Sequence, residues 1–331
     1  MTAPTIYDVA ASAGVSISTV SLCLNNPSRV AEATRDRILA AADALGYVPK
    51  ADAVSRARRA VGRIGVLAPF TSYASFGRRL NGILSEFAAI NLEVVVYDHE
   101  SAVVSPLVAT LPLTGRVDGL IVMSLPIDED VRRRLHEQDI PAVLLDTAQE
   151  GFDVVRTDDL AGGRLAGQHL IAQGHTRIGF LGEGWLAPHS HQSQCEQRLS
   201  GLRSAMADAG HMIHESHIRF TAHDLDSASS AAHALLDSPE RPTAVFAHDD
   251  LLAAATLRAA RELRLEVPAD LAVVGFDDTD IASALGLTTI RQPFEGSGQV
   301  AAKTLLDRMA DPTLPTRTTV LDLTLIHRAS S

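Results

Sequence analysis

The first part of the chain carries apolar residues at helical spacing, interrupted by short turn signals. A capping-box-like start at Thr5 begins one helix, and Gly14 can supply the left-handed turn that ends it. Ser16 then caps a second helix that runs to about Leu24. A third helix is predicted at about 32–45, where apolar residues fall on one face and a glycine follows. The pattern therefore predicts a three-helix module whose first two helices are joined by a tight turn.

From about residue 63 the pattern changes to short β-branched runs that alternate with amphipathic helical stretches. This alternation predicts parallel sheets with helices on both faces, and so many strands divide more easily into two doubly wound subdomains than into one sheet. Ligands of such sheets bind at the carboxyl ends of the strands, so we expect a site in the cleft between the two halves. The predicted strands are 64–68, 93–98, 119–123, 142–146, 177–181, 218–221, 244–247, 272–276 and 289–291.

Composition is typical of a large globular protein. The 331 residues are 46% hydrophobic, 21% charged and 4% aromatic, which is enough to bury a large core and suggests more than one domain. Cys23 and Cys195 cannot form a disulfide framework, and the first residues lack the basic and apolar run of an export signal. Apolar runs end well before the ~20 residues that a membrane span needs. We therefore expect a cytoplasmic protein with no membrane partner.

Charge is distributed unevenly along the chain. The net charge of −11 taken alone argues against a nucleic-acid partner, because phosphate binding depends on clustered Lys and Arg. Residues 1–63, however, hold eight Lys or Arg against five Asp or Glu, a net charge of +3, while the remaining residues carry −14. A small basic head on an acidic body would show this asymmetry.

Several short motifs carry a family resemblance. In the first part they are Tyr7–Ala10, Ala13–Ser16, Thr19–Ser21, Asn25 and Gly46–Pro49. In the α/β part they include Arg63–Val66, Val117–Ile121, Gly174–Ile178, Arg198–Gly201, Val274–Asp278 and Leu287–Pro293. At these spacings the motifs resemble the LacI family of transcriptional regulators over essentially the whole chain. The resemblance implies a helix-turn-helix head joined by a hinge to a periplasmic-binding-protein-like sensor of two doubly wound parallel-sheet subdomains.

The predicted domain bounds follow from the pattern and the resemblance together. We expect the helix-turn-helix head at 1–46, the hinge at 47–61 and the effector-binding and dimerisation domain at 62–331. Within the last, the N-subdomain is expected at about 62–159 and 290–318, and the C-subdomain at about 160–289 and 319–331.

The head's second helix is the predicted reader of DNA. In helix-turn-helix proteins this helix enters the major groove and its first turns reach base edges, while hydroxyls, amides and helix ends hold phosphates. The resemblance implies that Ile17, Ser18 and Leu22 read bases. It implies further contacts, mostly to the DNA backbone, from Thr5, Tyr7, Ser16, Thr19, Ser21, Asn25, Arg29, Thr34, Tyr47, Lys50, Ala53 and Arg56. The alternative is a small helical domain whose exposed residues only face solvent.

The chain departs from the family pattern at three places. Leu22 stands where most members have an Arg, so the operator half-site should differ, because Leu cannot make the bidentate contact to guanine. Ala31 replaces the usual Ser or Thr cap of the third helix. In the hinge, Lys50 and Arg56 replace the usual Asn and the Leu that wedges into the minor groove, so we expect binding there by charge with less kinking.

The expected effector site combines fixed charges with aromatic side chains. Carboxylates accept hydroxyl groups and Arg donates in a fork, which suits a polyhydroxylated ligand. His248 replaces a common Asn, and for Asp249 a helix cap is an equally good interpretation. The residues that the resemblance and their predicted positions assign to the effector are Phe76, Asp146, Trp185, Arg198, His248, Asp249 and Asp277.

Other chemistry finds little support. The run His211, His214 and His217 and the pair His189 and His191 have no flanking Cys and fall in polar loops, so we expect solvated histidines and no metal. No nucleotide-binding glycine motif, P-loop lysine or G-x-S-x-G elbow occurs, so we expect neither cofactor nor enzyme activity.

The sequence thus predicts an effector-controlled DNA-binding regulator that acts as a repressor. Its expected partners are a pseudo-palindromic operator, a sugar or sugar derivative and a second copy of the chain. One alternative is the same regulator with a purine or other non-sugar effector. A sugar-modifying enzyme and an exported sugar-binding protein are less favoured. The place of action would be the cytoplasm, at the nucleoid when DNA is bound.

Overall fold

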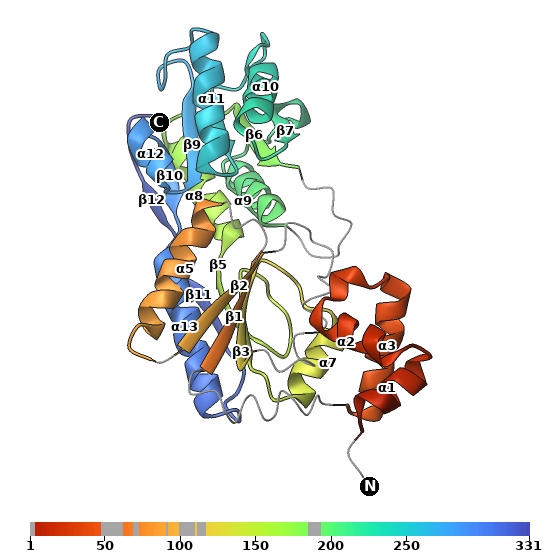
Figure 1. Cartoon of the computed structure of the whole chain (residues 1–331). Helices are drawn as coiled ribbons and strands as arrows, with labels where there is room; N and C mark the ends of the chain where they lie inside the picture. Colours follow the sequence, from red (N-terminus) through yellow and green to blue (C-terminus); the bar gives the residue numbers. More distant parts are fainter. Residues whose placement is uncertain are drawn as a thin grey trace. The chain divides into compact units, whose positions relative to one another are not determined.

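The computed structural model describes residues 4–47, 62–68, 73–90, 92–98, 110, 117–184 and 193–331 (Figure 1). The chain divides into two compact units. Unit 1 comprises Met1–Arg156 and Phe294–Thr319, and unit 2 comprises Thr157–Pro293 and Val320–Ser331. Each unit is thus built from segments that lie far apart in the sequence.

The head at the start of unit 1 has the three helices that the sequence predicts. They are α1 (Ile6–Ala13), α2 (Ile17–Asn25) and α3 (Glu32–Leu45), with a 3-10 turn, η1 (Pro27–Arg29), before α3. Gly14 ends α1 in the left-handed conformation (φ 64°), which a residue with a Cβ adopts only at a cost. The helices enclose their own core, in which Val9, Val20 and Ile38 are fully buried. Ala31 caps α3 without a side-chain hydrogen bond, as its sequence predicts.

The rest of unit 1 is a sheet of six strands in the order β11-β5-β4-β3-β1-β2. The strands are β1 (Gly62–Ala68), β2 (Leu92–Asp98), β3 (Gly119–Met123), β4 (Ala142–Leu145), β5 (Asp153–Thr157) and β11 (Thr318–Leu321). The helices are α5 (Ala74–Phe87), α7 (Glu129–Glu137) and α13 (Phe294–Ala310). β1 to β5 pair in parallel. Alternate strand residues such as Leu120 and Val122 pack with Val131 and Leu135 of α7. Gly119 lies instead against Leu305 of α13.

Unit 2 repeats this architecture with the order β12-β10-β9-β8-β6-β7. Its strands are β6 (Ile178–Glu183), β7 (Ile218–Thr221), β8 (Ala244–Ala247), β9 (Ala272–Asp277), β10 (Thr288–Arg291) and β12 (Thr324–Ile326). Its helices are α8 (Asp159–Ala172), α9 (Gln194–Asp208), α10 (Leu225–Leu236), α11 (Asp250–Glu262), α12 (Asp280–Leu285) and the 3-10 turn η2 (Glu215–His217). β12 pairs with β10 in the antiparallel direction, whereas β10 with β9, β9 with β8, β8 with β6 and β6 with β7 pair in parallel.

Side-chain alternation along the unit 2 strands produces two separate core layers. Leu181, Val245 and Val273 pack with α10 and α11, and Phe180, Phe246 and Val274 pack with α8 and α9. The sheet is therefore covered by helices on both faces, which explains why its central strands are continuously apolar. The carboxyl ends of β6, β8 and β9 consequently meet at one edge.

All nine strands predicted from the sequence are present within a few residues, and the predicted fold class is confirmed. Three strands, β5, β11 and β12, are absent from the prediction. β5 begins with Asp153, which is 3% exposed and pairs with Arg308 at 2.9 Å. Because the compensating charge comes from α13, nothing near Asp153 in the sequence marks it as a core position.

None of the described helices is by itself long and apolar enough to cross a bilayer. α1 and α2 satisfy the length and composition only jointly, across a bend of 104°.

Candidate functional site

The start of α2 presents hydroxyl groups and one apolar side chain to solvent. Ser16 caps the helix, since its Oγ accepts the backbone N–H of Thr19 at 3.1 Å. The Ser16 Oγ also lies 2.8 Å from the Ser18 Oγ. Ile17 stands between these hydroxyls with 40% of its surface exposed. A helix N-terminus with hydroxyl groups at the surface can hold a phosphate, and an exposed apolar side chain beside it can contact a thymine methyl group.

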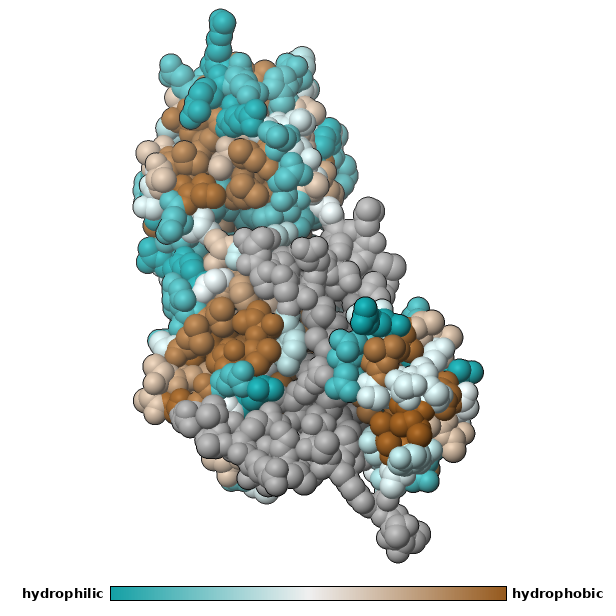
Figure 2. Space-filling view, in the orientation of Figure 1, coloured by the Kyte–Doolittle hydropathy of each residue, from teal (hydrophilic) through white to brown (hydrophobic). Residues whose placement is uncertain are grey.

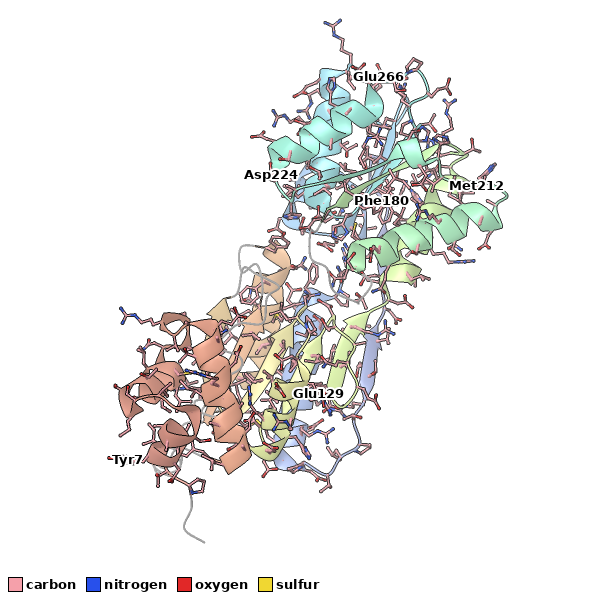
Figure 3. All side chains as sticks on the ribbon, turned by 90° about the vertical axis from the view of Figure 1, so that its right-hand side faces the viewer. Tyr7, Glu129, Phe180, Met212, Asp224 and Glu266 are labelled. Atoms are coloured by element: carbon pink, nitrogen blue, oxygen red, sulfur yellow. The ribbon has the colours of Figure 1, made fainter. Side chains whose placement is uncertain are left out.

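The other predicted DNA-contact residues differ in how far they reach the surface. Tyr7 is 67% exposed and projects from the head (Figure 3). Asn25 is exposed and donates its side-chain amide to the Ser21 carbonyl at 2.9 Å. Leu22 is half-buried against the head core, and Tyr47 is buried in it. Of the remaining predicted residues, Thr5, Thr19 and Thr34 are half-buried, Arg29 is exposed, and Lys50, Ala53 and Arg56 lie outside the described residues.

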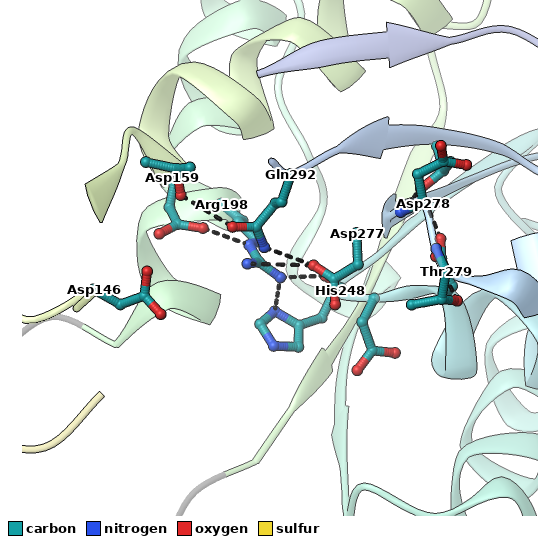
Figure 4. A network of polar contacts seen from close by, with 12 residues as sticks. Asp146, Asp159, Arg198, His248, Asp277, Asp278, Thr279 and Gln292 are labelled. Atoms are coloured by element: carbon teal, nitrogen blue, oxygen red, sulfur yellow. Dashed lines mark hydrogen bonds and ion pairs between the residues drawn. The ribbon is translucent and has the colours of Figure 1, made fainter. Parts of the chain in front are cut away.

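In unit 2, several charged and polar side chains surround Arg198 of α9, and we call this group the Arg198 cluster (Figure 4). The Arg198 Nε donates to the Asp159 carboxylate at 2.8 Å and one Nη donates to the His248 carbonyl at 2.6 Å. The guanidinium lies 3.7 Å from the centre of the Phe276 ring, a cation–π contact. The second Nη lies 3.9 Å from Asp277. Arg198 is therefore held on several sides and is only 3% exposed.

Close helix packing brings Arg198 to this position. α8 and α9 meet at Gly163 and Gly201, and a Cβ on Gly163 would overlap the carbonyl oxygen of Arg198. A Cβ on Gly201 would overlap the Leu160 carbonyl in the same way. Only glycine permits this approach, which carries Arg198 to Asp159 at the start of α8.

Asp277 is the last residue of β9 and has a positive φ of 105°. Gln292 donates its side-chain amide to the Asp277 carboxylate at 2.6 Å and accepts from the Thr157 hydroxyl at 3.1 Å. Gln292 itself is 4% exposed. A buried amide with both ends engaged fixes the direction of the Asp277 carboxylate.

Two histidines flank Asp249 at the carboxyl end of β8. Asp249 caps α11 by accepting the Leu252 N–H at 2.8 Å, and its other oxygen lies 2.5 Å from His223 Nε2. Asp249 is thus a helix cap, and its role in effector binding stays a prediction. The His248 Nδ1 lies 3.4 Å from an Arg198 Nη, and its Nε2 lies 3.7 Å from Glu183.

The environment assigns different charge states to the two histidines. Burial, together with Arg198, lowers the pKa of His248 to about 3, so His248 is neutral. Burial also opposes the charged form of His223, but the hydrogen bond and charge of Asp249 outweigh it and raise the His223 pKa. Burial would raise the pKa of Asp249, yet His223 and His248 hold it below its usual value. The contact between His223 and Asp249 therefore favours the charged forms of both groups.

The remaining predicted effector residues either belong to unit 1 or fall outside the described residues. Asp146 belongs to unit 1, where it pairs with Arg79 at 2.7 Å and accepts from the Ser124 hydroxyl at 3.2 Å. Phe76, on α5 of unit 1, is 8% exposed. Trp185 lies outside the described residues. Of the seven predicted residues, the structure thus brings four together: Arg198, His248, Asp249 and Asp277.

The sequence prediction does not include Asp159, His223, Glu183, Gln292 or Arg79. One signal could have found Arg79. The run Arg79-Leu80-Asn81-Gly82 on α5 matches Arg198-Leu199-Ser200-Gly201 on α9. Both arginines are buried over a phenylalanine, Arg79 at 4.7 Å from the Phe294 ring centre, and both pair with an aspartate.

Among the described residues, no group of three or more His, Cys, Asp or Glu is arranged to hold a metal ion. His211, His214 and His217 are described, whereas His189 and His191 are not.

Two family models match the chain. Residues 5–50 match the lacI family of bacterial regulatory proteins, and residues 168–331 match the periplasmic binding protein-like domain.

Individual relatives match over nearly the whole length. The chain is 33% identical over 332 residues to the HTH-type transcriptional repressor PurR of Photobacterium profundum, covering 98% of each chain. Among solved structures, it resembles a complex of the transcriptional regulator CelR with cellobiose, with a TM-score of 0.73, 30% identity and coverage of 99% and 100%. It also resembles the lac repressor dimer bound to operator and the anti-inducer ONPF, with a TM-score of 0.72, 28% identity and 99% coverage of each chain.

Proposed function

The chain belongs to the lacI family of bacterial regulatory proteins. From this premise we propose that it is a transcriptional repressor whose affinity for operator DNA is lowered or raised by a bound sugar or sugar derivative. The regulator class itself follows from the family. The observation that carries the effector proposal is the Arg198 cluster, in which a guanidinium, a neutral imidazole and several carboxylates meet at the carboxyl edge of the unit 2 sheet. Carboxylates, imidazoles and guanidinium groups form hydrogen bonds with ligand hydroxyl groups. The similar solved structure of the regulator CelR is a complex with cellobiose.

We assign base contacts to Ile17, Ser18 and Leu22. The first two are exposed at the start of α2, which supports the assignment. Half-burial of Leu22 leaves only part of its side chain for DNA. Tyr7, Ser16, Ser21, Asn25 and Arg29 position the phosphate backbone in this proposal.

We propose a homodimer, because a two-fold operator is read by a two-fold protein. Each unit exposes large apolar side chains that a partner could cover, and Figure 2 shows hydrophobic surface over α5 and β2 and over α11 and α12. In unit 1 these side chains are Leu84 (43% exposed) on α5 and Val96 (40%) on the edge strand β2. In unit 2 they include Ile281 (40%) and Leu285 (45%) on α12.

We propose the domain bounds that the sequence predicts, with the head at 1–46, the hinge at 47–61 and the sensor at 62–331. Tyr47, at the start of the proposed hinge, packs in the head core. The head has its own closed core, which supports an independent DNA-binding module. A regulator of this kind acts where the DNA is, so we place it in the cytoplasm.

Selection of operators from random DNA tests the DNA-binding part of the proposal. The full chain should enrich a pseudo-palindromic sequence, and a variant lacking residues 1–61 should enrich none while remaining folded and dimeric. A head-deleted variant that still enriches the same sequence would show that DNA binding resides elsewhere.

A further inference from the structure

Carboxylates outnumber cations around Arg198. Among the described residues of this cluster, the cations are Arg198 and His223, and His248 is neutral. The carboxylates are Asp159, Asp249, Asp277 and Glu183. The cluster therefore has an excess of negative charge even when His223 is protonated.

The positive charge is also the less accessible one. The Arg198 side chain is 4% exposed, and its donors are engaged by Asp159 and by the His248 carbonyl. The side chains of Asp277 and Glu183 are 17% and 25% exposed. The carboxylates of Asp277 and Glu183 are therefore more accessible to solvent than the Arg198 guanidinium.

The pKa shifts of two neighbouring groups, His223 and Asp250, agree with this excess of carboxylates. His223 lies among Asp249, Glu183 and Asp277, and although burial opposes its charge, these carboxylates raise its pKa. Asp250, the next buried carboxyl group, shows the opposite response, since burial and then the charge of Asp277 raise its pKa to about 7. Nearby carboxylates thus favour the charged form of His223, and the charge of Asp277 adds to burial in disfavouring the charged form of Asp250.

We infer that the effector of this cluster carries no negative charge and that a protonated amine strengthens its binding, so that the favoured ligand is a hydroxylated amine such as an amino sugar. This inference rests on the proposed function, because it concerns the effector of the same site. Carboxylates accept both hydroxyl and ammonium groups, with the charged hydrogen bond the stronger of the two. A phosphorylated or carboxylated ligand would instead be repelled by the partly exposed carboxylates of Asp277 and Glu183.

Matched ligand series test the inference by isothermal titration calorimetry on the full chain at neutral pH. One series is glucose, glucosamine and glucose 6-phosphate; another is adenosine, 5′-amino-5′-deoxyadenosine and adenosine 5′-monophosphate. In any series that binds, the amine should bind more tightly than the uncharged parent, and the phosphate at least about tenfold more weakly. An amine that binds no more tightly than its parent would contradict the inference. A phosphate that binds as tightly as its parent would overturn the inference, and so would the absence of binding by every compound.

Glu183→Gln identifies the source of the discrimination. Removing this carboxylate should reduce the difference in affinity between the phosphate and its uncharged parent severalfold, because one repelling charge is lost. Glu266→Gln makes the same charge change at an exposed residue beyond the far end of α11, labelled in Figure 3, and should leave the gap unchanged. Equal effects of the two variants would assign the discrimination to overall charge and contradict the inference. Operator binding by the full chain is measured in a separate experiment. A full chain that binds no operator would contradict the proposed function, whereas the ligand series tests the inference about the effector.

Discussion

Arg79 and Asp146 form an ion pair of 2.7 Å in unit 1, with side chains that are 8% and 3% exposed. The sequence predicts Asp146 as an effector ligand, but the structure shows that its carboxylate already has a permanent cationic partner. Arg79 comes from α5 and is held over Phe294 at the start of α13. Asp146 thus has a cationic partner within unit 1, and its contact with an effector stays a prediction.

Removing Arg79 should strongly lower the stability of the protein, and removing both Arg79 and Asp146 should lower it much less. Arg79→Leu leaves the Asp146 carboxylate buried without its cation, and we expect the free energy of unfolding to fall by about 3–5 kcal/mol. The double variant Arg79→Leu with Asp146→Leu should recover most of this loss. Urea denaturation of the two single variants and the double variant completes the cycle. Additive losses would show that the two side chains do not interact.

Helix contact through glycine should control the Arg198 position. Gly163→Ala places a methyl group against the Arg198 carbonyl, so we expect a loss of about 1–3 kcal/mol of stability and weaker effector binding. Gly77→Ala is the matched control, because Gly77 on α5 is exposed with open space around its Cβ position. That variant should be neutral or slightly stabilising, as alanine favours helix more than glycine does. Thermal unfolding of both variants compares them, and equal losses would refute the role of close packing.

Gln292 should act on the effector through Asp277. Gln292→Leu removes the amide that orients the Asp277 carboxylate, and we expect effector affinity to fall by about tenfold. Thr157→Val removes only the hydroxyl that orients Gln292, so its effect should be smaller. Calorimetry with the best-binding compound measures both. An unchanged affinity in Gln292→Leu would mean that Asp277 needs no such support.

Asp250 should make stability depend on pH. Its carboxylate accepts hydrogen bonds from the Thr279 N–H and the Thr289 hydroxyl, both at 2.6 Å, yet burial and Asp277 raise its pKa from 3.8 to about 7. Between these two values the folded state binds a proton that the unfolded state releases, so this residue's contribution to stability falls as pH rises. Asp250→Asn removes the dependence. The stability of the wild type relative to this variant should decline from about pH 4 to pH 7, by up to about 4 kcal/mol.

Denaturation of both proteins across this range gives the result directly. A constant difference between wild type and Asp250→Asn would show that Asp250 titrates near its ordinary value.

The sequence predicts the fold well because local patterns determine most of it. Helical spacing with caps defines α1 and α2, and apolar β-branched runs define the central strands. The missed strands β5, β11 and β12 are only five, four and three residues long, and each mixes polar with apolar residues. Their residues depend on partners supplied by distant segments, as Asp153 depends on Arg308.

The site was only partly predictable for a related reason. Arg198, His248 and Asp277 stand at strand ends or within a recognised motif, so the resemblance identifies them. His223 follows β7 in a polar stretch, and only the folded chain shows that it reaches Asp249. Gln292 likewise gains its meaning from Thr157, 135 residues earlier in the sequence. The charge balance of the cluster therefore could not be read from the chain alone.

The central claim is that ligand binding at the Arg198 cluster controls operator binding. The most direct measurement is fluorescence anisotropy of a selected operator with full-length wild type and with Asp277→Ala, each with and without the tightest-binding compound. In the wild type the compound should change operator affinity at least about tenfold, equivalent to about 1.4 kcal/mol of coupling. Asp277→Ala should bind the operator with similar affinity but respond much less to the compound. An operator affinity that the bound compound leaves unchanged in the wild type would contradict the account.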